Sequence, residues 1–188
     1  MAQRPTTDER IADATLALLR TKGAGAVTVE AVAARSGIAK TTIYRRHRDR
    51  RAMLSAALTG IANPEPLADD ATAPDRLRWV IQEAVKAIDD GIGFGGLASL
   101  LTDDDPDFTK LFRRILARQR AKLESVIDDA KGDGSFRADV DGATLIDAIV
   151  GAHIAERSRT GRITAAWERR LFDLFRPSVL TRVQSCSS

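Results

Sequence analysis

Residues 28–46 read TVEAVAARSGIAKTTIYRR, and this stretch determines the fold of the N-terminal part of the chain. It predicts two short helices joined by a tight turn, because Thr28 can cap the first helix and Gly37 can adopt the positive φ that the turn needs. Ala33 is small enough for the two helices to cross closely. Three apolar residues should face a small core that holds the second helix in place: Val32, Ile38 and Ile43. This is the pattern of a helix-turn-helix.

The second of these helices carries donors and cations on its outer side. Such groups suit contacts to phosphates and to base edges in the major groove of DNA. The outward positions are Lys40, Thr41, Thr42, Tyr44, Arg45 and Arg46. A two-helix packing unit with a polar surface is the alternative interpretation, and the local charge argues against it.

Charge is distributed unevenly over the 188 residues, whose formal total is +3. The first 60 residues hold 11 Lys and Arg against 5 Asp and Glu, a net of +6, so the remainder is mildly acidic. Residues 45–51 read RRHRDRR. A basic end joined to an acidic body indicates an anionic partner for that end, either a nucleic acid or a membrane surface.

Several classes of protein do not fit the sequence. Cys186 is the only cysteine, which excludes a disulfide framework and a cysteine-rich zinc site. The two histidines, His47 and His153, have no metal-ligand spacing, and no glycine-rich phosphate loop follows a strand pattern. We therefore expect no enzymatic activity, no metal and no cofactor. The polar N-terminus has no signal-peptide core, so the cytoplasm is the expected location. An acidic run, residues 103–107, is interpreted as a helix start rather than a cation site.

Helical spacing of apolar residues continues along the chain, and period-two alternation is absent. We predict an all-α fold of about nine helices, in which the last two span roughly residues 141–157 and 164–176. Pro177 should end or kink the last helix. Glycines crowd residues 91–96, which should be either flexible or closely approached by another element. The predicted domains are 1–50 for DNA binding, 51–183 for ligand binding and dimerisation, and a disordered tail at 184–188.

The stretch from Arg10 to Leu58 resembles the N-terminal DNA-binding domain of the TetR family of transcriptional regulators. The matching residues include 12–23, the pattern Thr-Val-x-x-Val-Ala at 28–33, and 37–45. The chain departs from the family at three positions. His47 stands where many members have Phe or Trp, Arg48 stands for a Pro, and Ala39 replaces a common Ser that would cap the following helix.

The resemblance implies roles for individual residues. Thr28, Tyr44 and Arg50 would contact phosphates, whereas Arg46 and Arg48 could contact phosphates or bases. Arg4 could enter a neighbouring minor groove. The residues that would reach base edges are Lys40, Thr41, Thr42 and Arg45. His47 is either a core residue or a further phosphate contact. A helical membrane-surface or structural protein, with a basic patch and no preference for a DNA sequence, is the alternative function.

One helix-turn-helix is too small to specify a site well, so a homodimer on a palindromic operator is expected. The helix near residues 141–157 is apolar on more than one side and must bury both, against its own core and against a second copy. A monomeric bundle is the alternative. The expected interface residues are Ile146, Ile149, Val150, His153, Trp167, Leu171, Leu174 and Phe175.

The resemblance also implies a small-molecule effector that binds in the body of the chain and releases the DNA. The candidate lining residues are Trp79, Phe94, Phe112, Gln119 and His153.

Overall fold

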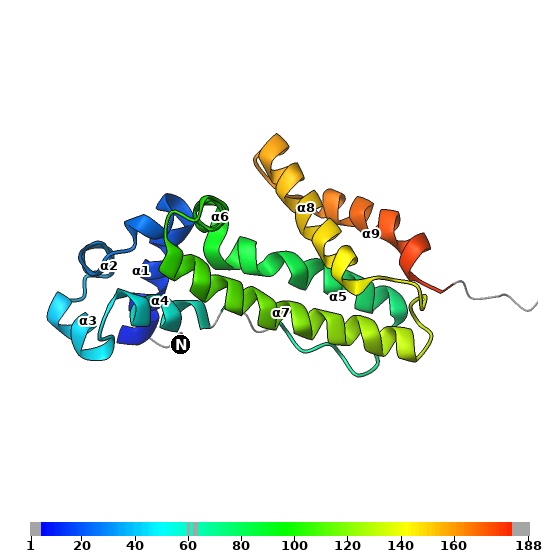
Figure 1. The fold of residues 1–188 in the computed structure, drawn as a ribbon, viewed down its shortest axis with the longest axis horizontal. Coiled ribbons are helices and arrows are strands. Elements are labelled where there is room, and N and C mark those ends of the chain that lie inside the picture. The colour runs from blue at the N-terminus through cyan, green and yellow to red at the C-terminus, as the bar shows by residue number, and fades with distance from the viewer. Residues whose placement is uncertain (1–4, 60, 62–63, 182–188) are drawn as a thin grey trace, which may run out of the picture. The chain divides into compact units, whose positions relative to one another are not determined.

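The computed structural model describes residues 5–59, 61 and 64–181 (Figure 1). These residues form helices and no strand, which confirms the predicted fold class. Arg4 and the predicted tail at 184–188 lie outside the described residues. The helices are α1 (Thr7–Lys22), α2 (Val29–Ser36), α3 (Lys40–Arg46), α4 (Arg50–Thr59), α5 (Ala73–Lys86), α6 (Gly93–Thr102), α7 (Pro106–Gly132), α8 (Gly142–Thr160) and α9 (Ala165–Val179), with a 3-10 turn at Ala24–Ala26 and a π-helical segment at Ala87–Ile92.

The chain forms two compact units. The head unit comprises Met1–Asn63 and Lys86–Arg118, and the body unit comprises Pro64–Val85 and Gln119–Ser188. The functional boundary that the sequence places after residue 50 stays a prediction, since the head unit also includes α4 and α6.

Both ends of helix α1 are capped. The Thr6 backbone N–H donates to the Glu9 carboxylate at 2.6 Å, and the Glu9 N–H donates to the Thr6 hydroxyl at 3.2 Å, a reciprocal cap. Gly23 ends the helix at φ 81°, with its N–H donating to the carbonyl of Leu19 at 3.0 Å. Helix α1 then packs against α2, α4 and α6 as the centre of the head unit.

The glycines of residues 91–96 allow α6 and the segment before it to approach α1. A Cβ at Gly95 would lie 2.7 Å from the backbone oxygens of both Leu19 and Arg20, and Gly93 has a φ of 62°. Of the two interpretations of this cluster, close approach is the one the structure shows. The helix before α6 becomes π-helical at Ala87, and the Arg20 side chain donates to the carbonyl of Gly91 at 2.7 Å.

The body unit has its own core, to which α5, α7, α8 and α9 contribute. It contains Leu77, Val80, Ile81, Ala84, Leu123, Ile127, Ala130, Phe136, Leu145, Ile146, Ile149, Trp167, Leu171, Phe172 and Val179. Phe136, in the loop after α7, is buried because its N–H donates to the carbonyl of Ala130 at 2.8 Å and folds the loop inward. Pro177 does not end α9, which continues to Val179, since a proline in the last turn disrupts few of the bonds of a helix.

Candidate nucleic-acid interface

The predicted helix-turn-helix is present and intact. Thr28 caps α2, with its hydroxyl accepting from the N–H of Ala31 at 3.1 Å. Gly37 ends α2 in the left-handed conformation, at φ 68°. The predicted core residues Val32, Ile38 and Ile43 are all buried, which fixes the rotation of α3 about its own axis.

That rotation leaves the outer side of α3 free. Ile43 has no exposed surface, whereas Tyr44 is 51% exposed. Thr42 is half-buried, and the other predicted contact residues of the helix are exposed: Lys40, Thr41, Tyr44, Arg45 and Arg46. Cationic, hydroxyl and phenol groups therefore share one accessible surface, which we call the α3 face.

Exposed ion pairs hold several of the predicted contact residues. The Lys40 ammonium lies 3.3 Å from the carboxylate of Glu30 on α2. The pKa of Glu30 is lowered by a hydrogen bond from its own backbone and by Lys40. Such surface pairs are weak and can exchange for a phosphate at little cost. Two similar pairs are Arg46 with Asp8, at 2.5 Å, and Arg48 with Asp49, at 3.2 Å.

Arg45 differs from its basic neighbours on α3. Within the part of the chain that the structure describes, its guanidinium forms no ion pair, and the side chain is exposed. It can therefore reach a base edge without first breaking an intramolecular contact.

Two of the polar groups of Thr28 already have partners within the chain. Its backbone N–H already donates to the carbonyl of Ala26 at 3.1 Å. Its hydroxyl oxygen accepts from Ala31, so the hydroxyl proton is the group that can donate outward.

Arg50 is the residue whose surroundings differ most from the sequence prediction. Its Nε donates to the carbonyl of Val27 at 2.5 Å, and its Nη2 donates to the carbonyl of Ala24 at 2.6 Å and to the carboxylate of Asp105. The guanidinium thus ties the turn after α1 to the start of α7. Its predicted role as a phosphate contact stays a prediction, and it would require this network to open.

Asp105 also caps α7, because its carboxylate accepts from the N–H of Phe108 at 3.0 Å. The acidic run is therefore a helix start, as predicted. Partial burial raises the pKa of Asp105, but the hydrogen bonds from Arg50 and Phe108 and the charge of Arg50 outweigh it, so the net pKa is lowered.

The departures from the family pattern have visible consequences. Ala39 stands at the N-cap of α3 and provides no side-chain hydrogen bond. His47 ends α3 and is half-buried, a position compatible with both of its predicted roles.

The five candidate effector residues are divided between the two units. Phe112 is buried in the head unit, where its ring stacks on Phe108 with centroids 5.7 Å apart, and Phe94 is in the same unit. The other three belong to the body unit. Trp79 donates to the carbonyl of Glu65 at 2.9 Å, and Gln119 donates to the carbonyl of Glu83 at 2.8 Å.

Most of the predicted dimer residues are directed inward. Five of the eight are buried within their own unit: Ile146, Ile149, His153, Trp167 and Leu171. The His153 ring packs edge-on against Trp167 at a centroid distance of 5.6 Å. The sequence pattern did not separate these residues from those left outside, which are Val150, Phe175 and above all Leu174, 67% exposed.

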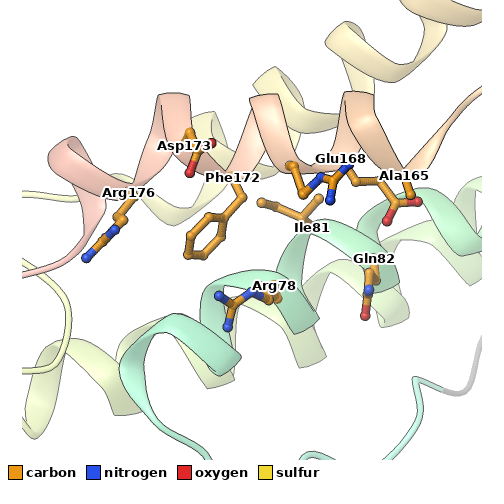
Figure 2. A pocket seen from close by; sticks show the side chains of 9 residues that line it. Arg78, Ile81, Gln82, Ala165, Glu168, Phe172, Asp173 and Arg176 are labelled. Carbon is orange, nitrogen blue, oxygen red and sulfur yellow. The ribbon is translucent and has the colours of Figure 1, made fainter.

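Sequence reasoning also missed a groove in the body unit. It lies between α5 and α9 and has a volume of about 420 Å³ (Figure 2). None of the five candidate effector residues lines it. Its residues come from two helices far apart in the sequence, and no pattern within either helix marks them.

Comparisons with known proteins identify the N-terminal domain. Residues 11–57 match the family model described as bacterial regulatory proteins, tetR family. A search of curated proteins finds no match to the chain. Many solved structures share its fold, and we describe three.

One is a Rhodococcus protein described as a TetR-family transcriptional regulator, with a TM-score of 0.70 and 18% identity over 89% of this chain and 97% of the other. The regulator FadR of Bacillus subtilis, in complex with stearoyl-CoA, has a TM-score of 0.67 and 18% sequence identity. The match covers 90% of this chain and 97% of the other. A Saccharomonospora viridis protein described as a transcriptional regulator, in complex with choline, has a TM-score of 0.68 and 19% sequence identity. The match covers 93% of this chain and 98% of the other.

The N-terminal domain of this chain is therefore a tetR-family domain, and the chain has the fold of TetR-family transcriptional regulators. In the described residues, no helix is long and apolar enough to cross a membrane.

Proposed function

We propose that this protein is a transcriptional regulator that binds a palindromic operator as a homodimer, acts in the cytoplasm and has no catalytic activity. The observation that carries the proposal is the α3 face. Its cations and hydroxyls are exposed because Ile43 anchors the opposite side of the helix in the core. The cations can contact DNA phosphates, and Arg45 can form a bidentate contact to guanine.

A membrane-surface protein would use the same basic charge but would have no preference for a DNA sequence. The tetR-family match over residues 11–57 favours DNA over lipid. The two candidates differ in one measurable property, since only a DNA-binding regulator distinguishes a preferred duplex from a scrambled one.

Selection of preferred duplexes from a random pool, at stated salt, tests the proposal. We expect a twofold-symmetric sequence to emerge and to outcompete its scrambled counterpart. The matched control is Arg162→Ala, which removes an exposed arginine of the body unit and should leave the preference unchanged. If no sequence is enriched and the protein binds anionic vesicles as tightly as it binds duplex DNA, the membrane-surface alternative is favoured.

We further propose that a small-molecule effector lowers operator affinity, and that repression is the regulatory outcome. The structures in complex with choline and with stearoyl-CoA support a ligand-responsive body in this fold. All five predicted lining residues stay candidates, and three of them, Trp79, Gln119 and His153, share the body unit. Titration of candidate ligands against the operator complex tests this part. If no ligand weakens the complex, the effector proposal fails while the DNA-binding proposal stands.

A further inference from the structure

The groove between α5 and α9 has an apolar floor and a charged rim. Ile81 and Phe172 form the floor, and they are buried, with 2% and 9% of their surface exposed. The other lining residues are Arg78, Gln82, Ala165, Glu168, Arg169, Asp173 and Arg176. A volume of about 420 Å³ lies within the range of small-molecule sites, about 300–1,000 Å³.

The guanidinium of Arg78 is held in place over this floor. Its central carbon lies 4.5 Å from the centroid of the Phe172 ring, a cation–π contact. The carboxylate of Asp75, one turn earlier on α5, lies 3.0 Å from Nη1. A guanidinium has five N–H donors, so the remaining ones are available to a ligand, and the side chain is 53% exposed.

The two ends of the groove differ in character. Figure 2 shows Arg78 and Arg176 near the ring of Phe172, whereas Gln82, Ala165 and Glu168 lie toward the other end. Asp173 is on the Arg176 side as well, and Asp75 pairs with Arg78, so two guanidinium groups at this end accompany two carboxylates. Within the described part of the chain, Arg176 has no ion-pair partner, and its side chain is exposed. The guanidinium of Arg176 is therefore the group at this end that is available to an anion.

We infer that this groove binds an organic carboxylate with an apolar body. The carboxylate lies between Arg78 and Arg176, where planar guanidinium groups can donate paired hydrogen bonds. The apolar body covers Ile81 and Phe172, and Glu168 repels a second negative charge at the far end. The chemical class is thus a monoanion of moderate size. This binding does not depend on whether the chain binds DNA.

Calorimetric titration of the full chain, without DNA, tests the inference. The probes are 2-naphthoate and its neutral counterpart 2-naphthamide, which have the same ring system. We expect the carboxylate to bind at least about tenfold more tightly than the amide, because only the anion gains charge-assisted hydrogen bonds. Failure of 2-naphthoate to bind at millimolar concentration, or equal binding of the two probes, would overturn the inference.

Two matched variants locate the site. Arg176→Gln should weaken 2-naphthoate binding about tenfold and leave the amide unaffected. Arg170→Gln makes the same change on the same helix at a residue that does not line the groove, where it lies 3.5 Å from Glu156, and should have no effect. Because Arg176 is exposed, its replacement should not alter the thermal unfolding of the chain. Equal weakening by both variants would mean that the anion binds elsewhere.

Discussion

Arg45 is the residue of α3 best placed to read sequence. It is exposed and belongs to no ion pair within the described residues, whereas Lys40 and Arg46 are each paired with a carboxylate. We predict that Arg45→Ala relaxes sequence preference, lowering the ratio of specific to scrambled binding about 10- to 100-fold, the value of one good bidentate contact to guanine. Competition binding measures it. Uniform weakening on all duplexes would instead identify Arg45 as a phosphate contact.

Arg50 belongs to the same basic run but has a different environment. It donates to the carbonyls of Ala24 and Val27 and to Asp105, and is only 30% exposed. Arg50→Gln should therefore lower the free energy of unfolding by about 2–3 kcal/mol, somewhat less than for a fully buried pair. Urea unfolding measures the change, and Arg51→Gln, at the exposed neighbouring residue, is the control.

The same Arg50 variant also tests the phosphate role that the family resemblance implies. A phosphate contact would reduce the slope of log affinity against log salt by about 0.9. A change in that slope without loss of stability would show that the internal network is not the main role of Arg50.

At the scale of elements, α3 begins without a cap. Ala39 has an extended conformation, φ −58° and ψ 139°, and forms no side-chain hydrogen bond to the first turn. We predict that Ala39→Ser stabilises the protein by about 0.5–1 kcal/mol, because a serine hydroxyl can accept from an unpaired N–H of that turn. Thermal unfolding measures it. Ala39→Val cannot cap and serves as the control; equal gains from both would refute a capping effect.

The crossing of α1 and α6 depends on the absence of a side chain at Gly95. A Cβ there would meet two backbone oxygens at 2.7 Å, and backbone atoms cannot easily move aside. Gly95→Ala should destabilise the protein by about 1–3 kcal/mol. Gly151, in α8, has nothing within 4 Å of its Cβ position, so Gly151→Ala should stabilise by about 0.5–1 kcal/mol. Opposite shifts of the urea midpoint are expected, and shifts of the same sign would contradict the close approach.

Local chemistry explains which elements could be predicted. The left-handed Gly37 and the buried Ile43 depend on residues within a few positions of them, so spacing alone predicted both. The acceptors of Arg50 lie 23, 26 and 55 positions away, and no local pattern contains them. The same limit applies to the groove between α5 and α9.

Apolar spacing could not tell which partner buries an apolar residue. Ile149 and Trp167 were predicted for a dimer surface, but the core of their own unit covers them. The α3 face was easier to predict, because Ile43 leaves only one orientation for a short helix.

At the scale of the whole molecule, a second copy requires an apolar surface that the protomer leaves open. Leu174 on α9 is 67% exposed, with Phe175 and Val150 half-buried. We predict that Leu174→Asp weakens homodimerisation at least about tenfold, because a carboxylate would have to be desolvated in the interface. Sedimentation equilibrium measures the dissociation constant.

Leu101 provides the matched control for that substitution. It is 72% exposed but lies in the head unit, so Leu101→Asp should leave the dimer unchanged. If the wild type is monomeric at all concentrations, or if both variants dissociate alike, the interface does not involve Leu174.

Helix α7 spans 27 residues, and the boundary between the head and body units falls within it, after Arg118. Its first turn is capped by the carboxylate that also receives the Arg50 guanidinium, and its far end leads into the loop of Phe136. The first part of α7 thus belongs to the head unit and the rest to the body unit, so unwinding of either end would remove helical residues from the unit at that end. Residues of α7 therefore contribute to both units, and a substitution that unwinds the helix at one end should destabilise the unit at that end.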